Sequence, residues 1–110
     1  MSSPVLVIGA LGNVGAEVVK HLLSKGKAVR AADMDPRKIK ERFGDSVEAA
    51  RFDFTDSTTY AATFQGVKKM FYMRPPHLRN IQRDMYPSMD AAKQAGVSHV
   101  VFLSLIGIEN

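Results

Sequence analysis

The feature that most constrains the fold of this chain is a run of three evenly spaced glycines between an apolar segment and an amphipathic one. Residues 9–15 read Gly-Ala-Leu-Gly-Asn-Val-Gly. Residues 4–8 before them are apolar throughout, which is typical of a parallel strand that helices cover on both faces. Residues 13–25 carry apolar side chains at helical spacing and precede Gly26, which ends the helix. A strand, a glycine-rich turn and a helix in this order predict the start of an α/β fold.

The spacing of the glycines has a physical reason in proteins that bind a dinucleotide. Gly9 permits a tight turn, Gly12 leaves room for a pyrophosphate beside the backbone, and Gly15 lets the helix pack closely on the strand. The helix N-terminus offers free N–H groups and partial positive charge to phosphate. A turn that is glycine-rich for geometry alone needs only one or two glycines. We therefore predict that NAD or NADP binds at this turn.

The rest of the chain repeats the alternation of strand and helix. Further strands are expected at residues 28–33, 47–53, 68–73 and 99–105. The helices between them are marked by an N-cap at Asp35, an N-cap at Asp56 or Ser57, and an apolar stripe from Ile81 to Ala92 in which Pro87 should bend the axis. We predict one domain over residues 1–110. Its fold class is α/β, a Rossmann-type doubly wound parallel sheet of five strands in the order 3-2-1-4-5, with helices on both faces.

Composition excludes several classes of protein. The 110 residues are 45% apolar and 24% charged, as in ordinary globular proteins, and they include no cysteine for a disulfide, a thiolate metal site or a nucleophile. His21, His77 and His99 do not cluster with acids at ligand spacing, so we expect no metal. No segment approaches the roughly 18 apolar residues of a membrane span, and the N-terminus lacks a signal-peptide pattern. We expect a cytoplasmic protein without a membrane partner.

The net charge of +4 raises the question of nucleic acid. Most of the basic residues are scattered. One cluster stands out: Arg37, Lys38, Lys40 and Arg42. It lies on a helical stretch without interleaved aromatics, so we interpret it as a solvated helix face rather than a nucleic-acid surface.

Asp33 is the candidate selector between NAD and NADP. It ends the second expected strand, 18 residues after Gly15, where a Rossmann domain places the acid that binds the adenosine ribose. A carboxylate accepts a hydrogen bond from the 2′-hydroxyl but repels a 2′-phosphate, by up to about 4 kcal/mol at about 4 Å before screening. Arg37 or Lys38 could neutralise such a phosphate, and Asp33 could instead cap a turn. We favour NAD, because Asp35 has a capping role and Asp33 has none.

Two further strand ends are expected at the same edge of the sheet. Asp53 and Phe54 follow the third strand, where either a contact to adenine or a plain strand terminus with Phe54 in the core is expected. Met73 and Arg74 leave the fourth strand. Because ligands of open α/β sheets lie outside the carboxyl ends of the strands, we predict that Met73 and Arg74 border the dinucleotide.

Several segments together resemble the short-chain dehydrogenase/reductase superfamily, specifically its atypical NmrA-like members. These segments are the glycine motif, the Asp53-Phe54 step, residues 70–76 (Met-Phe-Tyr-Met-Arg-Pro-Pro), residues 91–97 (Ala-Ala-Lys-Gln-Ala-Gly-Val) and residues 100–104 (Val-Val-Phe-Leu-Ser). The resemblance implies a pyrophosphate loop formed by Gly9, Leu11, Gly12, Asn13 and Val14. It also implies that Asp33 and Met34 face the ribose. Met34 stands where NADP-binding relatives often carry arginine, which again favours NAD.

The chain departs from the family pattern at the catalytic residues and in length. Ordinary members use a Tyr-x-x-x-Lys pair, but Tyr60, Tyr72 and Tyr86 are followed four residues later by phenylalanine, proline and aspartate. Ser104 matches the family's serine after the fifth strand, yet a lone hydroxyl is more often a local hydrogen-bonding group, so we assign no catalytic residue. Family members are more than twice as long and build the substrate pocket from the part absent here.

Two functions are compatible with this pattern. The first is the cofactor half of an NAD(P)-dependent oxidoreductase, such as a quinone or carbonyl reductase. The alternative is a redox-sensing regulator that binds the dinucleotide without turning it over. We also expect homo-oligomers through the fifth strand, because no sixth strand covers it and residues 100–106 are almost continuously apolar.

Overall fold

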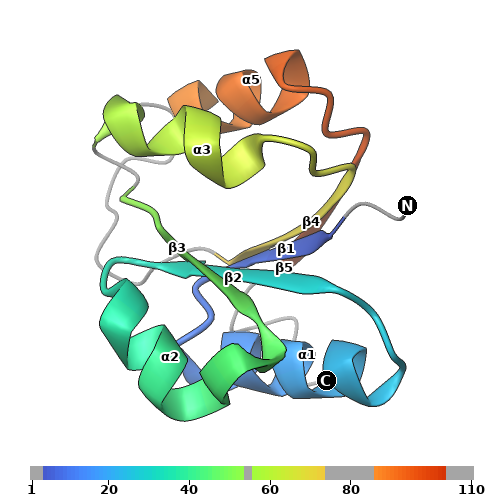
Figure 1. Ribbon diagram of the computed structural model, residues 1–110. Coiled ribbons are helices and arrows are strands. Elements are labelled where there is room, and N and C mark those ends of the chain that lie inside the picture. Colours follow the sequence, from blue (N-terminus) through green and yellow to red (C-terminus); the bar gives the residue numbers. More distant parts are fainter. Residues whose placement is uncertain (1–3, 54–55, 74–85, 104–110) are drawn as a thin grey trace.

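The computed structural model describes residues 4–53, 56–73 and 86–103. Its strands are β1 (Val5–Ile8), β2 (Val29–Asp33), β3 (Glu48–Arg51), β4 (Lys69–Met73) and β5 (His99–Leu103). Its helices are α1 (Asn13–Ser24), α2 (Pro36–Phe43), α3 (Tyr60–Phe64) and α5 (Tyr86–Gln94), with short 3₁₀ turns η1 (Gly44–Ser46) and η2 (Ser57–Thr59). All neighbouring strands are parallel and lie in the order β3-β2-β1-β4-β5 (Figure 1). The predicted fold class and strand order are confirmed.

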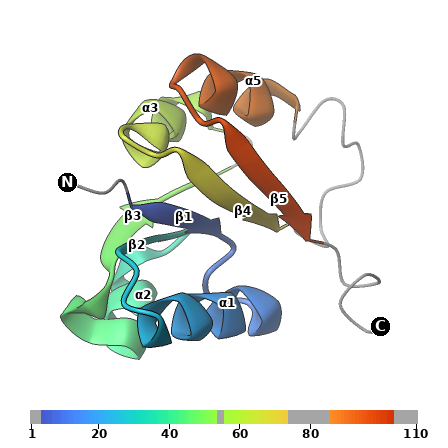
Figure 2. The same ribbon diagram turned by 90° about the vertical axis from the view of Figure 1, so that its right-hand side faces the viewer.

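The sheet lies between two layers of helices. Helices α1 and α2 cover one face, and α3 and α5 cover the other (Figures 1 and 2). On β1, Leu6 and Ile8 point into the cluster under α3 and α5, whereas Val7 points into the cluster under α1 and α2. All three side chains are at most 1% exposed. Coverage of both faces therefore explains why this strand is apolar at every position.

Aromatic packing holds the short helix α3 against the sheet. Phe52 stacks on Tyr60 with ring centroids 5.5 Å apart, and Phe64 lies 5.7 Å from Phe52. The C-terminal carbonyls of this helix are satisfied from β2, because the Arg30 guanidinium donates to the oxygens of Thr63 at 2.9 Å and Gln65 at 2.6 Å. A helix of five residues is marginal on its own, so these tertiary contacts stabilise it.

The predicted N-caps of two helices are confirmed. The Asp35 carboxylate accepts from the Arg37 N–H at 3.0 Å, and Pro36 occupies the first helical position. Asp56, rather than Ser57, caps η2, where its carboxylate accepts from the backbone and hydroxyl of Thr58. The same hydrogen bonds lower the pKa of Asp56.

The third strand is shorter than the predicted span of residues 47–53. The Asp53 N–H donates to the Thr59 hydroxyl at 3.2 Å, and the Asp53 carbonyl accepts from the Asp56 N–H at 3.0 Å. Residue 53 therefore belongs to the turn that leads into η2, and the ladder ends at Arg51.

The helix predicted from Ile81 can be followed from Tyr86 onward. Ile81 and Met85 lie outside the described residues, and so do Ser104 and Leu105 after β5. Pro87 lies in α5, next to Tyr86, the first residue of this helix that the structure describes. The bend that we expect at Pro87 depends on the preceding residues and stays a prediction. No helix in the described part of the chain has the length and apolarity needed to cross a membrane.

Loss of the Arg30 side chain should destabilise the fold. In Arg30→Met the carbonyls at the end of α3 lose their charged donor, so we expect unfolding to become easier by about 1–3 kcal/mol in urea titrations. Arg37→Met is the matched control, since Arg37 is exposed on α2 and its change should stay within about 0.5 kcal/mol. Equal stability of the two variants would contradict the capping role of Arg30.

Candidate dinucleotide-binding site

The glycine-rich loop leaves the sheet where its strand order reverses. Strand β1 pairs with β2 on one side and with β4 on the other. The chain runs outward from β1 through β2 to β3 and then returns to β4 and β5. Such a switch point leaves a crevice outside the carboxyl ends of the strands, where open α/β sheets bind ligands. The loop therefore lies at the position in the fold that favours a ligand.

The three glycines of the loop differ in why the backbone needs them. Gly9 has φ +86°, a conformation that side chains disfavour. A Cβ on Gly15 would lie 2.0 Å from the carbonyl oxygen of Gly9, so only glycine allows α1 to start this close to the loop. A Cβ on Gly12 would lie 3.4 Å from that oxygen, an ordinary contact. The predicted structural roles of Gly9 and Gly15 are confirmed, whereas no contact with the described residues requires glycine at position 12.

Hydrogen bonds fix the path of the loop. The N–H groups of Gly9 and Ala10 donate to the Ala32 carbonyl at 2.9 and 3.2 Å. The Gly12 N–H donates back to the Gly9 carbonyl at 3.0 Å. The loop is therefore held to the end of β2 as well as to itself.

The N-terminus of α1 opens toward solvent without a side-chain cap. Its N-cap is Gly12, whose carbonyl accepts from the Ala16 N–H at 2.9 Å. Among the described residues, no acceptor contacts the N–H groups of Asn13, Val14 and Gly15. Such N–H groups, together with the helix dipole, form a site that attracts an anion.

Asp33 has a structural role that sequence reasoning missed. One carboxylate oxygen accepts from the Leu11 N–H at 2.9 Å, and the other accepts from the Met34 N–H at 2.8 Å. The argument that Asp33 is free for the ribose because it caps nothing is therefore wrong. Each oxygen keeps a second lone pair, so a ribose contact stays a prediction. Met34 beside it is 55% exposed.

Arg42 on α2 also contacts the loop, which the sequence did not indicate. Its guanidinium donates to the Leu11 carbonyl at 2.9 Å. Lys38, Glu41, Arg42 and Leu11 line a hollow of about 500 Å³ beside the loop. The basic cluster on α2 was interpreted as a solvated face, and this holds for only part of it. Lys40, like Arg42, donates to a backbone carbonyl, that of Val47 at 3.2 Å. The side chains of Arg37 and Lys38 are exposed.

The remaining predicted site residues are only partly described. Asp53 follows β3 and Met73 ends β4, both at the carboxyl edge of the sheet. Phe54 and Arg74 lie outside the described residues. The contacts of all four with a dinucleotide stay predictions. The described part of the chain contains no group of three or more His, Cys, Asp or Glu arranged to hold a metal ion.

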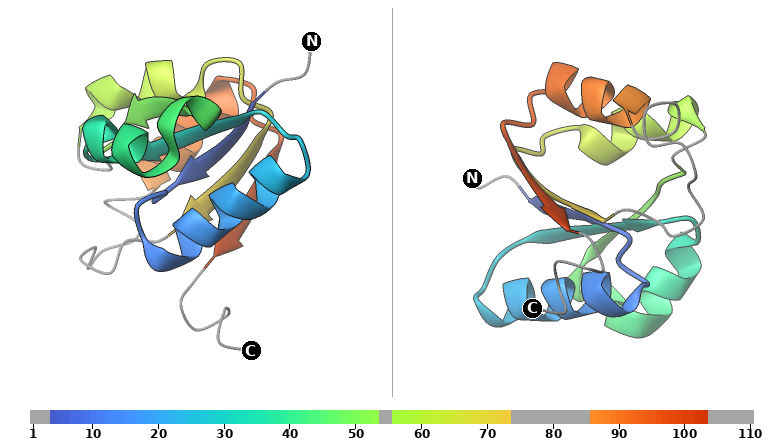
Figure 3. Two further views of the ribbon diagram at one scale, coloured as in Figure 1. Left: turned by 60° about the horizontal axis from the view of Figure 1, so that its bottom comes forward. Right: turned by 180° about the vertical axis from the view of Figure 1, so that it is seen from behind.

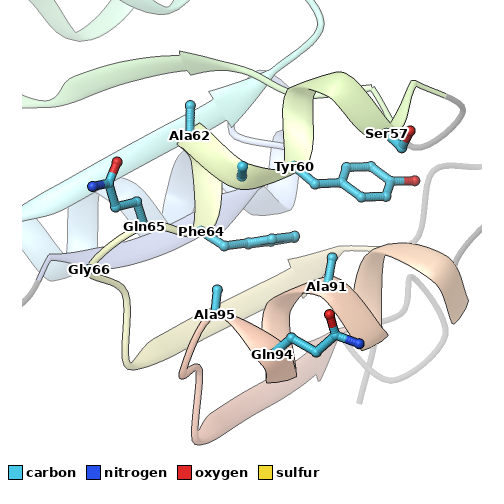
Figure 4. Close-up of a pocket in the computed structure, with 10 residues that line it drawn as sticks. Ser57, Tyr60, Ala62, Phe64, Gln65, Gly66, Ala91, Gln94 and Ala95 are labelled. Atoms are coloured by element: carbon cyan, nitrogen blue, oxygen red, sulfur yellow. The ribbon is translucent and has the colours of Figure 1, made fainter.

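A second, larger groove lies between α3 and α5 (Figure 4). It has a volume of about 810 Å³. Its lining residues are Ser57, Tyr60, Ala61, Ala62, Phe64, Gln65, Gly66, Ala91, Gln94 and Ala95. None of these carries a charge that could bind phosphate. The groove shares no residue with the predicted dinucleotide site.

The chain is similar to several proteins of known name, some of which are named as reductases. It is 33% identical to the NAD(P)H azoreductase of Xenophilus azovorans over 103 residues, 94% of this chain and 36% of that protein. It is 32% identical to prestalk A differentiation protein A of Dictyostelium discoideum over 108 residues, 96% of this chain and 36% of that protein. The crystal structure of triphenylmethane reductase from Citrobacter sp. complexed with NADP(H) superposes with a TM-score of 0.80 at 25% identity, covering 90% of this chain and 36% of that one.

The chain thus spans about a third of the length of the relatives that it matches. The model of the NmrA-like family matches residues 1–110. With the five-stranded parallel sheet and the glycine loop at its switch point, this match confirms the resemblance found in the sequence: the chain belongs to the NmrA-like family.

Proposed function

We propose that this chain binds NAD(P)H at the carboxyl edge of its sheet, with the pyrophosphate at the N-terminus of α1. The observation that carries the proposal is the arrangement of Gly12 and the three N–H groups that follow it. Gly12 is exposed, and the described residues leave room for a side chain there, so we assign its lack of a Cβ to contact with the dinucleotide. The N–H groups of Asn13, Val14 and Gly15 supply donors for phosphate oxygens.

The whole protein, in this proposal, is a reductase of which this chain is the cofactor-binding part. Support comes from the NAD(P)H azoreductase and the triphenylmethane reductase, to both of which the chain is similar. NAD(P)H supplies a hydride when bound. The residues of this chain hold and orient the dinucleotide, while the substrate site is assigned to the part of the relatives that this chain does not span.

For the choice of cofactor we propose NADPH, in place of the preference for NAD that the sequence favoured. Two backbone N–H groups partly neutralise the Asp33 carboxylate, which weakens its repulsion of a 2′-phosphate. In the hollow beside Leu11, the Arg42 guanidinium is already bonded to the Leu11 carbonyl, so the exposed Lys38 is the cation that we assign to a 2′-phosphate. The similar triphenylmethane reductase is also complexed with NADP(H).

We propose that two copies of this chain associate through β5. Among the described strands, β5 pairs only with β4 and forms the edge opposite β3 (Figure 3). Val100 on this strand is 44% exposed. An exposed apolar edge favours pairing with a second copy.

Substitution at Gly12 should separate binding from folding. In Gly12→Val the added side chain projects toward the bound pyrophosphate, so NADPH binding should fall below detection in titration calorimetry while the far-UV spectrum is unchanged. Gly15→Ala is the contrasting variant, because its Cβ would meet the Gly9 carbonyl and should lower the unfolding midpoint. Wild-type affinity in folded Gly12→Val would overturn the assignment of the site.

Lys38 should discriminate between the two dinucleotides. We expect wild-type protein to bind NADPH at least as tightly as NADH, and Lys38→Met to weaken NADPH about 2- to 10-fold with NADH unchanged. Lys25→Met is the control, since Lys25 is an exposed cation at the opposite end of α1. If the wild type binds NADH clearly more tightly, Asp33 is the selector after all.

Light scattering after size exclusion tests the association of two copies. At tens of micromolar we expect the mass of a dimer, and Val100→Lys should shift it toward that of a monomer because a charge opposes strand pairing. His99→Lys adds a lysine at the neighbouring position of the same strand. Comparing the two variants shows whether the loss of the dimer depends on position 100. A monomer mass for the wild type contradicts the proposal.

A further inference from the structure

Charged side chains hold the glycine loop on both sides of Leu11. The Leu11 N–H donates to the Asp33 carboxylate on β2, and the Leu11 carbonyl accepts from the Arg42 guanidinium on α2, each at 2.9 Å. These partners lie 22 and 31 residues away along the chain. Two consecutive peptide groups of the loop are thus fixed by residues outside it.

The contact from Arg42 sets the orientation of the peptide between Leu11 and Gly12. The carbonyl of this peptide faces Arg42, and its N–H faces the Gly9 carbonyl at 3.0 Å. If this peptide rotated by half a turn, its carbonyl oxygen would face the Gly9 carbonyl oxygen in place of the Gly12 N–H. Two carbonyl oxygens would then repel each other. The two opposed hydrogen bonds resist that rotation next to the first N–H groups of α1.

Packing of α2 determines where Arg42 lies. Ile39 on this helix is fully buried in the cluster under α1 and α2, and Phe43 packs against the same cluster. Arg42, adjacent to Phe43, is exposed yet reaches the loop from this anchored helix. A charge-assisted hydrogen bond from a fixed element orients its acceptor more strongly than a neutral one.

We propose that Arg42 is a positioning residue for dinucleotide binding, which fixes the Leu11–Gly12 peptide and so sets affinity for the pyrophosphate without touching the cofactor. The inference rests on the proposed function. It differs from the role given to Lys38, because the pyrophosphate is common to both dinucleotides and a 2′-phosphate is not.

Calorimetry with NADH and NADPH tests this role. In Arg42→Met both dissociation constants should rise by a similar factor, about 5- to 20-fold, and Arg42→Lys should recover part of the loss. Lys25→Met should change neither. A loss confined to NADPH would make Arg42 a direct phosphate ligand and overturn the proposal, as would unchanged affinity for both.

Amide hydrogen exchange of the unliganded chain gives a readout that needs no cofactor. In Arg42→Met the amides of Leu11 and Gly12 should exchange faster, while the buried amides of β1 and β4 keep their protection. Unchanged exchange at Leu11 and Gly12 overturns the positioning role. If the wild type binds neither dinucleotide, the proposed function fails, and the exchange experiment still decides whether Arg42 holds the loop.

Discussion

The close approach of α1 to the end of β1 is the constraint on which the site depends. Gly15 lies so near the Gly9 carbonyl that a single added carbon would occupy the same space as the loop backbone. This contact sets the angle at which the helix leaves the sheet, and with it the direction of the free N–H groups at its start. The proposed dinucleotide site therefore depends first on the steric fit between helix and strand, and only then on hydrogen bonding.

Most of the fold could be predicted because local signals and burial agree. The apolar run before Gly9 indicated a strand covered on both faces, and Asp35 with Pro36 indicated a helix start. The third strand was predicted too long, since the pattern of apolar residues does not show that the Thr59 hydroxyl draws Asp53 into a turn. Element ends are decided by such single contacts, which periodicity cannot show.

Sequence reasoning brought the loop and Asp33 to one edge of the sheet but missed the hydrogen bonds that connect them. The loop and Asp33 meet at one edge, as expected from parallel strands, yet Asp33 was interpreted as free when its carboxylate holds Leu11 and Met34. Arg42 was grouped with its basic neighbours. Sequence gives the charge of a surface helix but not which of its side chains reaches back to a loop. That information appears only when Ile39 and Phe43 fix the rotation of α2 about its axis.

The contacts that shape the loop have a consequence for the order of folding. Among the described residues, every hydrogen bond to the loop backbone comes from residues 9–42, which together with β1 form one continuous βαβα unit. Chains emerge from the ribosome N-terminus first, and domains fold as units during synthesis. The geometry of the loop is therefore encoded within the first half of this chain. During synthesis, that unit is complete before β4 is available to pair with the other side of β1.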